Sequence, residues 1–295
     1  MNNQQKACKV VKFGGSSLAD AEHFRKVHAI VTADPARRYV VPSAPGKRNK
    51  GDTKVTDMLY ECYNVSARGE AIDTIFARVQ ERYDGIIASL GLDLDLREEY
   101  AHIQWAITHH AGRDYAASRG EYLSGLILSA YLGYDFIDPA SYLRFQDDGA
   151  FDAELTNTLL SAELVRHENG VIPGFYGSMP NGTIRTFSRG GSDITGAIVA
   201  RAVLADIYEN WTDVNGFLMA DPRIVENPRR IDLITYRELR ELSYMGAGVF
   251  QEDAIFPVRF AGIPVNIRNT NEPDNPGTMI VSATDQYDTA NVITG

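Results

Sequence analysis

Two short segments of this sequence combine paired glycines with a basic residue and small hydroxyl side chains. The first runs from Lys12 to Ser17 (KFGGSS) and follows the apolar residues Val10 and Val11. A strand that hands two glycines to a helix N-terminus leaves backbone N–H groups uncovered, and such groups suit a phosphate. Lys12 would add a positive charge to a transferring phosphoryl group. An ordinary strand–turn–helix connection with a solvated lysine fits these six residues equally well.

The second segment runs from Thr186 to Asp193 (TFSRGGSD) and precedes a predicted helix from Ile194 to Leu204. Asn181-Gly182, just before it, predicts a hairpin turn between Tyr176 and Ile184. A guanidinium at the mouth of a glycine turn can bind a carboxylate or phosphate through two nitrogens, which is a role open to Arg189. Asp193 could serve the chemistry or could simply cap the helix.

Three further acidic residues could have either a functional or an ordinary structural role. Asp213 and Asp221 lie in turns that follow a predicted strand, Asp206 to Trp211, and could hold a nucleotide and its metal. They could equally be ordinary Asx-turns. Glu121 lies in a predicted helix from Asp114 to Leu132. A lone helical Glu is usually solvated, but its apolar neighbours predict burial.

The remaining hydrophobic pattern predicts alternating strands and helices. Strands are expected within 38–46 and at 135–138, 170–176, 264–268 and 278–281, and helices at 18–32, from 53 or 56 to 65, two or three times within 70–110, at 153–165 and near 236–246.

Composition narrows the class of protein. The chain has 295 residues, which predicts about two domains, and a net charge of −10, which disfavours a nucleic-acid or anionic-membrane surface. No apolar run approaches the roughly 20 residues of a membrane span, and residues 1–9 resemble no targeting signal, so we expect a cytoplasmic protein. Two cysteines, Cys8 and Cys62, argue against disulfides and thiolate zinc sites, and we expect both to be buried.

Taken together, five motifs resemble those of the aspartate kinases in the amino-acid kinase superfamily. In chain order they are KFGGSS at 12–17, SRGE at 118–121, FSRGGSD at 187–193, TD at 212–213 with ADPR at 220–223, and NT at 269–270 with PGT at 276–278. The resemblance implies a three-layer α/β/α sandwich with a mostly parallel central sheet. It implies a catalytic domain over 6–295, with an amino-acid-binding lobe at 6–195 and a nucleotide-binding lobe at 196–295. The C-terminal ACT regulatory domains usual in that family are expected to be absent.

The resemblance also implies an activity, which is the phosphorylation of the β-carboxylate of L-aspartate by ATP with Mg²⁺. This reaction opens the route to lysine, threonine and methionine, and a homodimer is implied as well. Two alternatives stay open: a kinase of another small carboxylate from the same superfamily, and a non-catalytic amino-acid-binding module. An NAD-dependent oxidoreductase is disfavoured because no Gly-x-Gly-x-x-Gly follows any predicted strand.

The residue roles that the resemblance implies fall into three groups, with no side chain expected as a dedicated metal ligand. Catalytic roles fall to Lys12 and Asp193; aspartate binding to Ser43, Thr56, Glu121, Arg189 and Ser192; ATP binding to Gly14, Gly15, Ser16, Thr212, Asp213 and Arg223. The chain departs from the family pattern on the nucleotide side. Leu218 stands where many members have an aromatic residue, and Gly248 and Gln251 stand where many have lysine and histidine.

Overall fold

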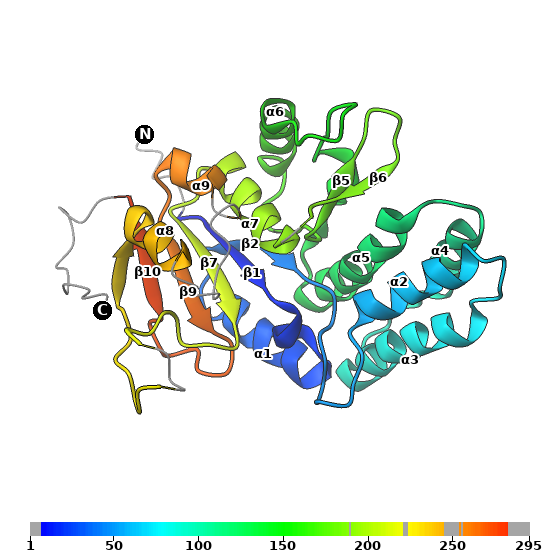
Figure 1. Ribbon diagram of the computed structural model, residues 1–295, viewed down its shortest axis with the longest axis horizontal. Helices are drawn as coiled ribbons and strands as arrows, with labels where there is room; N and C mark the ends of the chain where they lie inside the picture. The colour runs from blue at the N-terminus through cyan, green and yellow to red at the C-terminus, as the bar shows by residue number, and fades with distance from the viewer. Residues whose placement is uncertain (1–6, 189, 221–223, 245–253, 255, 283–295) are drawn as a thin grey trace.

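The strand that delivers the first glycine turn lies in the middle of an eight-stranded sheet (Figure 1). The computed structural model describes residues 7–188, 190–220, 224–244, 254 and 256–282. In spatial order the strands are β3 (Asp135–Phe136), β4 (Gly170–Val171), β2 (Arg37–Pro42), β1 (Lys9–Phe13), β7 (Ile207–Thr212), β9 (Val265–Asn269), β10 (Thr278–Val281) and β8 (Leu233–Thr235). A separate antiparallel hairpin pairs β5 (Tyr176–Ser178) with β6 (Ile184–Thr186).

The described helices are α1 (Ala21–Thr32), α2 (Val55–Ser66), α3 (Asp73–Leu90), α4 (Arg97–Thr108), α5 (Arg113–Leu132), α6 (Ala153–Leu164), α7 (Gly191–Ala202), α8 (Tyr236–Tyr244) and α9 (Phe256–Ala261), with short 3₁₀ helices η1 (Gly15–Leu18) and η2 (Pro139–Ser141). Helices α2 to α5 follow one another along the chain without an intervening strand, whereas strands separate most of the others.

The sheet is mostly parallel, as expected of strands buried on both faces. β1 pairs in parallel with β2 and with β7, and β9 pairs in parallel with β7. Among the described strands of this sheet only the β9–β10 pair is antiparallel. The carboxyl ends of β1, β2 and β7 therefore meet at one edge, where an open α/β sheet usually binds its ligand.

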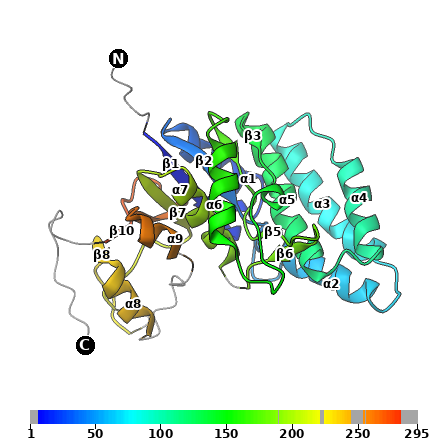
Figure 2. The same cartoon turned by 90° about the horizontal axis from the view of Figure 1, so that it is seen from above.

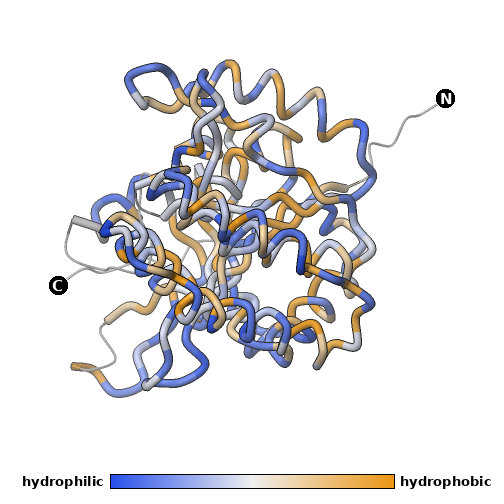
Figure 3. Tube along the Cα trace, turned by 90° about the vertical axis from the view of Figure 1, so that its right-hand side faces the viewer, coloured by the Kyte–Doolittle hydropathy of each residue, from blue (hydrophilic) through white to orange (hydrophobic). Residues whose placement is uncertain are grey.

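Alternate side chains of β1 enter two different hydrophobic cores. Val11 and Phe13 belong to the core that contains Trp211 and residues of helices α1 to α5, whereas Val10 belongs to the core that contains Tyr208 and residues of helices α6 to α9. This alternation places helices on both faces and confirms the three-layer α/β/α sandwich. In Figures 1 and 2, α4 lies at one end of the molecule and α8 at the other. Hydrophilic and hydrophobic residues alternate along the coiled segments of the trace (Figure 3), as expected of helices that bury one face.

Several predicted boundaries are wrong for local reasons. The helix expected from residue 18 begins at Ala21 behind η1, because Asp20 caps it by accepting from the His23 N–H. The helix expected from Ile194 begins three residues earlier, at Gly191. The strand expected over 170–176 divides into β4 and the start of β5, with Pro173-Gly174 between them. The short elements β8, α9 and η2 were not predicted from the sequence.

Two expectations from composition can be compared with the structure. Cys8 and Cys62 are both buried, as predicted, and burial raises the pKa of Cys8 to about 11 and of Cys62 to about 12. Neither thiol is therefore a thiolate at neutral pH. None of the helices in the described part of the chain is long and apolar enough to cross a membrane.

Candidate active site

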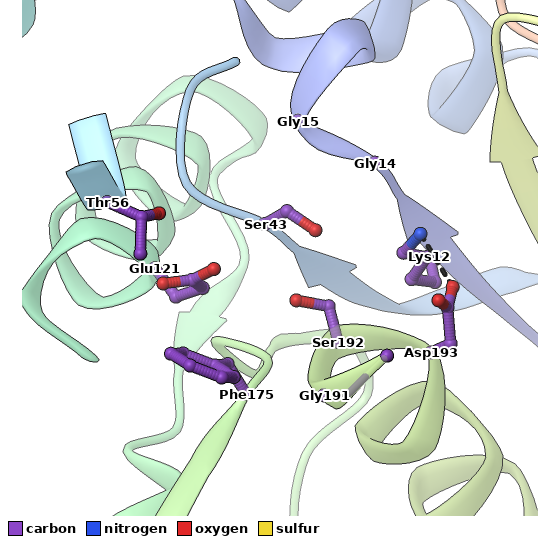
Figure 4. A pocket seen from close by; sticks show the side chains of 11 residues that line it. Lys12, Gly14, Gly15, Ser43, Thr56, Glu121, Phe175, Gly191, Ser192 and Asp193 are labelled. Carbon is purple, nitrogen blue, oxygen red and sulfur yellow. Dashed lines mark ion pairs between the residues drawn. The ribbon is translucent and has the colours of Figure 1, made fainter. Parts of the chain in front are cut away.

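A cavity of about 260 Å³ lies at the edge of the sheet where β1 and β2 end (Figure 4). Its walls come from the loops after these two strands, from α2 and α5, and from the start of α7. It is lined by Lys12, Gly14, Gly15, Ser43, Thr56, Glu121, Phe175, Gly190, Gly191, Ser192 and Asp193. Eight of the residues singled out from the sequence therefore meet in one cavity, although they span 182 positions from Lys12 to Asp193.

The glycines of the first turn let two loops touch. The Gly46 N–H donates to the Gly15 carbonyl oxygen at 2.8 Å, and a Cβ on Gly15 would come within 2.9 Å of the Ala44 carbonyl oxygen. A side chain at Gly15 would push the loops apart. The expectation of uncovered N–H groups is wrong for Gly14, whose N–H donates to the Trp211 carbonyl oxygen at 3.1 Å and continues the β1–β7 ladder.

Lys12 and Asp193 form an ion pair at one end of the cavity (Figure 4). Lys12 Nζ lies 2.7 Å from Asp193 Oδ1, and the lysine side chain is only 9% exposed. Asp193 is the third residue of α7, so it does not cap the helix; Gly190, with a left-handed φ of 54°, takes that position. A carboxylate in a first turn is favoured by the helix dipole. Asp193 thus holds the Lys12 ammonium beside the glycine turn.

Glu121 lies at the opposite end of the cavity, beside Thr56 (Figure 4). The residue is 6% exposed, and its Oε2 has no hydrogen-bond partner among the described residues. Burial raises the pKa of this carboxyl to about 8, against the lowering effects of the Ala44 backbone N–H and the Arg119 charge. A buried carboxyl oxygen without a partner is costly unless a ligand group donates to it, so Glu121 suits a cationic ligand group.

The wall between these two ends carries hydroxyl groups and one aromatic ring. Ser43 follows β2 and Ser192 lies in the first turn of α7, and their side chains face each other in Figure 4. Phe175 lines the same wall with a left-handed φ of 84°, which is strained for a bulky residue. Its ring fits only because position 191 is glycine, where a Cβ would come within 2.4 Å of the ring. Sequence reasoning missed Phe175, since no local pattern marks a strained aromatic residue.

Other residues expected at the site lie elsewhere. Ser16, in η1, does not line the cavity, nor do Thr212 and Asp213, which lie where β7 ends. Thr212 Oγ1 donates to Asp213 Oδ1 at 3.2 Å on the exposed surface. Arg189 and Arg223, together with Gly248 and Gln251, lie outside the residues that the structure describes. Leu218 is 38% exposed.

The described residues contain no group of three or more His, Cys, Asp or Glu side chains placed to hold a metal ion. Mg²⁺ commonly binds through one or two carboxylates plus the phosphates of a nucleotide.

The family comparison covers most of the chain. Residues 7–269 match the model of the amino acid kinase family. Among curated proteins, Aspartokinase 3 of Bacillus subtilis is 41% identical over 94% of this chain and 64% of its own length.

Solved structures of aspartate kinases are also similar to this chain. An aspartate kinase from Clostridium acetobutylicum, described as an allosteric enzyme, superimposes with a TM-score of 0.90 and 50% identity over 95% of this chain and 64% of that one. Aspartokinase III of Escherichia coli in complex with aspartate and ADP gives a TM-score of 0.81 and 27% identity, covering 95% and 65% of the two chains. The present chain thus spans slightly under two thirds of the length of these proteins.

Proposed function

This chain belongs to the amino acid kinase family, and on that premise we propose that it transfers the γ-phosphoryl group of ATP to the β-carboxylate of L-aspartate. The observation that carries the proposal is the distribution of charge in the cavity. The buried carboxyl of Glu121, whose Oε2 has no partner among the described residues, lies at one end, and the Lys12–Asp193 pair lies at the other. An amino acid with a free ammonium and a second carboxylate matches this arrangement.

In the proposed complex Glu121 receives the α-ammonium of aspartate. The ammonium supplies donors to the unpartnered Oε2, which removes the cost of its burial. The hydroxyls of Ser43, Thr56 and Ser192 would hold the carboxylates between the two ends of the cavity. Arg189 is proposed to bind the α-carboxylate. Glu121 would reject an acceptor whose amino group is acylated, or one that places an anionic group at this position. This disfavours other acceptors of the family.

The chemistry needs no general base. The side chain of aspartate has a pKa of about 4, so its carboxylate is already ionised at neutral pH. One carboxylate oxygen attacks the γ-phosphorus, a new O–P bond forms, the bond to the β–γ bridging oxygen breaks, and ADP leaves with that electron pair. The barrier arises from repulsion between two anions, and positioned positive charge lowers it. Lys12 supplies that charge and Asp193 orients it.

The nucleotide is proposed to bind beside Lys12, at the ends of β1 and β7. Gly14, Gly15 and Ser16 would face its phosphates, and Thr212, Asp213 and Arg223 its remainder. The described residues fit Mg²⁺ only as a partly hydrated ion, with Asp193 or Asp213 beside the phosphates, because they offer no three-carboxylate cluster. When bound, Mg²⁺ neutralises charge on the β- and γ-phosphoryl oxygens.

We propose that residues 6–195 form the amino-acid lobe and residues 196–295 the nucleotide lobe. The order of the sheet supports this division, since β1 to β4 occupy one half of it and β7 to β10 the other. The proposal extends to a cytoplasmic homodimer that uses L-aspartate and ATP in the first step towards lysine, threonine and methionine.

A substrate panel tests the proposed function. ADP release from Mg-ATP is followed with L-aspartate, L-glutamate and N-acetyl-L-aspartate as acceptors. Of these three acceptors, we expect only L-aspartate to cause ADP release. Equal release with N-acetyl-L-aspartate would overturn the role of Glu121, and aspartate binding without ADP release would replace the kinase with a binding module.

A further inference from the structure

Asn210 on β7 contacts both members of the ion pair. Its Nδ2 donates to Asp193 Oδ1 at 2.7 Å, and its Oδ1 lies 3.5 Å from Lys12 Nζ. Asn210 is 3% exposed, and it does not itself line the cavity. Asp193 Oδ1 therefore accepts from a charged and a neutral donor at once.

The register of the sheet explains why Asn210 reaches this position. Lys12 and Asn210 are directly paired across β1 and β7, so their side chains leave the same face of the sheet. Tyr208, two residues earlier on β7, shares that face, and its hydroxyl donates to the Asp193 main-chain carbonyl at 3.0 Å. Two side chains of β7 thus hold the first turn of α7, one at the backbone and one at the carboxylate.

We propose that Asn210 is a positioning residue that fixes the geometry of the Lys12–Asp193 pair, an inference that rests on the proposed function. A lysine ammonium can rotate freely about a single carboxylate partner. The Asn210 amide is neutral, so it orients both ions without adding charge: its N–H₂ fixes the carboxylate plane, and its oxygen offers Lys12 a second acceptor. Lys12 then keeps a defined direction towards the cavity.

A purely structural Asn210 would contribute to stability alone. The two roles are separated by Asn210→Leu, which keeps the approximate side-chain size but removes both contacts. If Asn210 positions Lys12, kcat falls about 10- to 100-fold, as expected when a reacting group is misplaced by a fraction of an ångström or more, while KM for aspartate and ATP changes little.

Asn266 on the neighbouring strand β9 provides a matched control. It is also buried, it is paired across β7–β9 with Glu209, and its Oδ1 has no hydrogen-bond partner among the described residues. Asn266→Leu makes the same chemical change in the same sheet, away from the ion pair. We expect its kcat to stay within about twofold of the unaltered chain. A similar fall in kcat for both variants would overturn the positioning role.

Asn210→Asp gives a second test, based on pH. The introduced carboxyl would lie in hydrogen-bond range of Asp193 and near Lys12. Because Asp193 already balances the Lys12 charge, burial and the like charge of Asp193 would raise the pKa of the introduced carboxyl. While protonated, it can donate to Asp193 as the amide does; once ionised, it repels Asp193 and competes for Lys12. We therefore expect kcat to fall as pH rises through that raised pKa, in a range where the unaltered chain shows no such fall.

The outcomes distinguish the two proposals. If the unaltered chain does not use aspartate, the proposed function itself is wrong. An active chain whose Asn210→Leu variant is folded, by circular dichroism, and keeps full kcat contradicts the inference alone. Should Asn210→Leu not fold, the pH profile of Asn210→Asp decides: a profile parallel to that of the unaltered chain contradicts the positioning role.

Discussion

Lys12 is held in place by a partner that leaves its charge available to the cavity. Its ammonium lies 2.7 Å from Asp193 and close to Gly14, where a Cβ would come within 3.5 Å of Nζ. The group is mostly buried, so its effect on a nearby phosphoryl group is screened less than that of a surface lysine. Lys12 can therefore account for much of the electrostatic stabilisation of a transferring phosphoryl group.

The first prediction concerns this charge. Lys12→Ala should lower kcat roughly 10²- to 10³-fold, by analogy with the loss of one preorganised electrostatic donor. Lys9→Ala is the matched control, because Lys9 lies on the same strand but pairs with Asp34 at 2.8 Å, away from the cavity. Steady-state kinetics on both variants provide the measurement. Near-normal kcat for Lys12→Ala would remove Lys12 from the mechanism.

The second prediction concerns the pH dependence of aspartate binding. The pKa of Glu121 is about 8, and only the ionised carboxylate attracts the ammonium of aspartate. KM for aspartate should therefore rise as pH falls below 8, approaching about tenfold for each pH unit. In Glu121→Gln, KM should be high at every pH. A KM that stays constant between pH 6 and 8 in the unaltered chain would contradict this role.

In the absence of substrate, the buried carboxyl of Glu121 should also lower the free energy of unfolding. Its pKa is raised above the ordinary value, so between about pH 4.5 and 8 the folded chain binds a proton that the unfolded chain has lost. The free energy of unfolding should therefore decline with rising pH across this window because of Glu121. Glu121→Gln should be more stable than the unaltered chain, with a difference that grows up to about pH 8. Urea unfolding at pH 5.5 and 8.5 measures it.

At the scale of elements, one arginine on α3 fastens the loop that follows β2. Arg82 is 6% exposed and donates to the Gly46 carbonyl oxygen at 3.1 Å and to Asp52 Oδ2 at 2.6 Å. Hydrogen bonds from Arg48, together with the charge of Arg82, lower the pKa of Asp52 despite its burial. This loop carries Ser43 at one end and leads to Thr56 at the other, so the anchor also shapes the cavity.

Arg82→Met should lower the free energy of unfolding by about 1–3 kcal/mol, because it removes the donor to the carbonyl oxygen of the buried Gly46, while Asp52 keeps its bonds to Arg48. It should also raise KM for aspartate, since the loop would no longer be held. The lowered pKa means that the contribution of Asp52 is present at neutral pH and is lost as pH falls below the ordinary Asp value. Arg97→Met, which breaks the exposed Arg97–Asp95 pair, is the control and should leave stability unchanged.

The elements that position the cavity could be predicted from the sequence in large part. β-branched runs ending in glycine predicted β1 and β2, and the 3.6-residue period predicted α5 around Glu121. How these elements pack together was harder to predict from the sequence. Asn210 stayed unnoticed because its role depends on the register between β1 and β7, which joins residues 198 positions apart. Phe175 and the early start of α7 depend on left-handed backbone at Phe175 and Gly190, which no periodicity encodes.

At the scale of the whole molecule, the described residues that line the cavity all precede the proposed division at residue 195. Asn210 on β7, which follows that proposed division, contacts the Lys12–Asp193 pair without lining the cavity. The chain spans 64% of the length of Aspartokinase 3 of B. subtilis. Lys12, Ser43, Glu121 and Ser192 nevertheless line one cavity within this chain, so the proposed function predicts that this chain shows the chemistry.

Trapping of the product with hydroxylamine tests the central claim most directly. The chain is incubated with Mg-ATP, L-aspartate and hydroxylamine, and the hydroxamate is identified by mass spectrometry against α- and β-aspartyl standards. The account predicts the β-hydroxamate of aspartate, formed only when both ATP and L-aspartate are present and strongly reduced in Lys12→Ala. Folded protein that gives no hydroxamate, or gives the α-isomer, would contradict it.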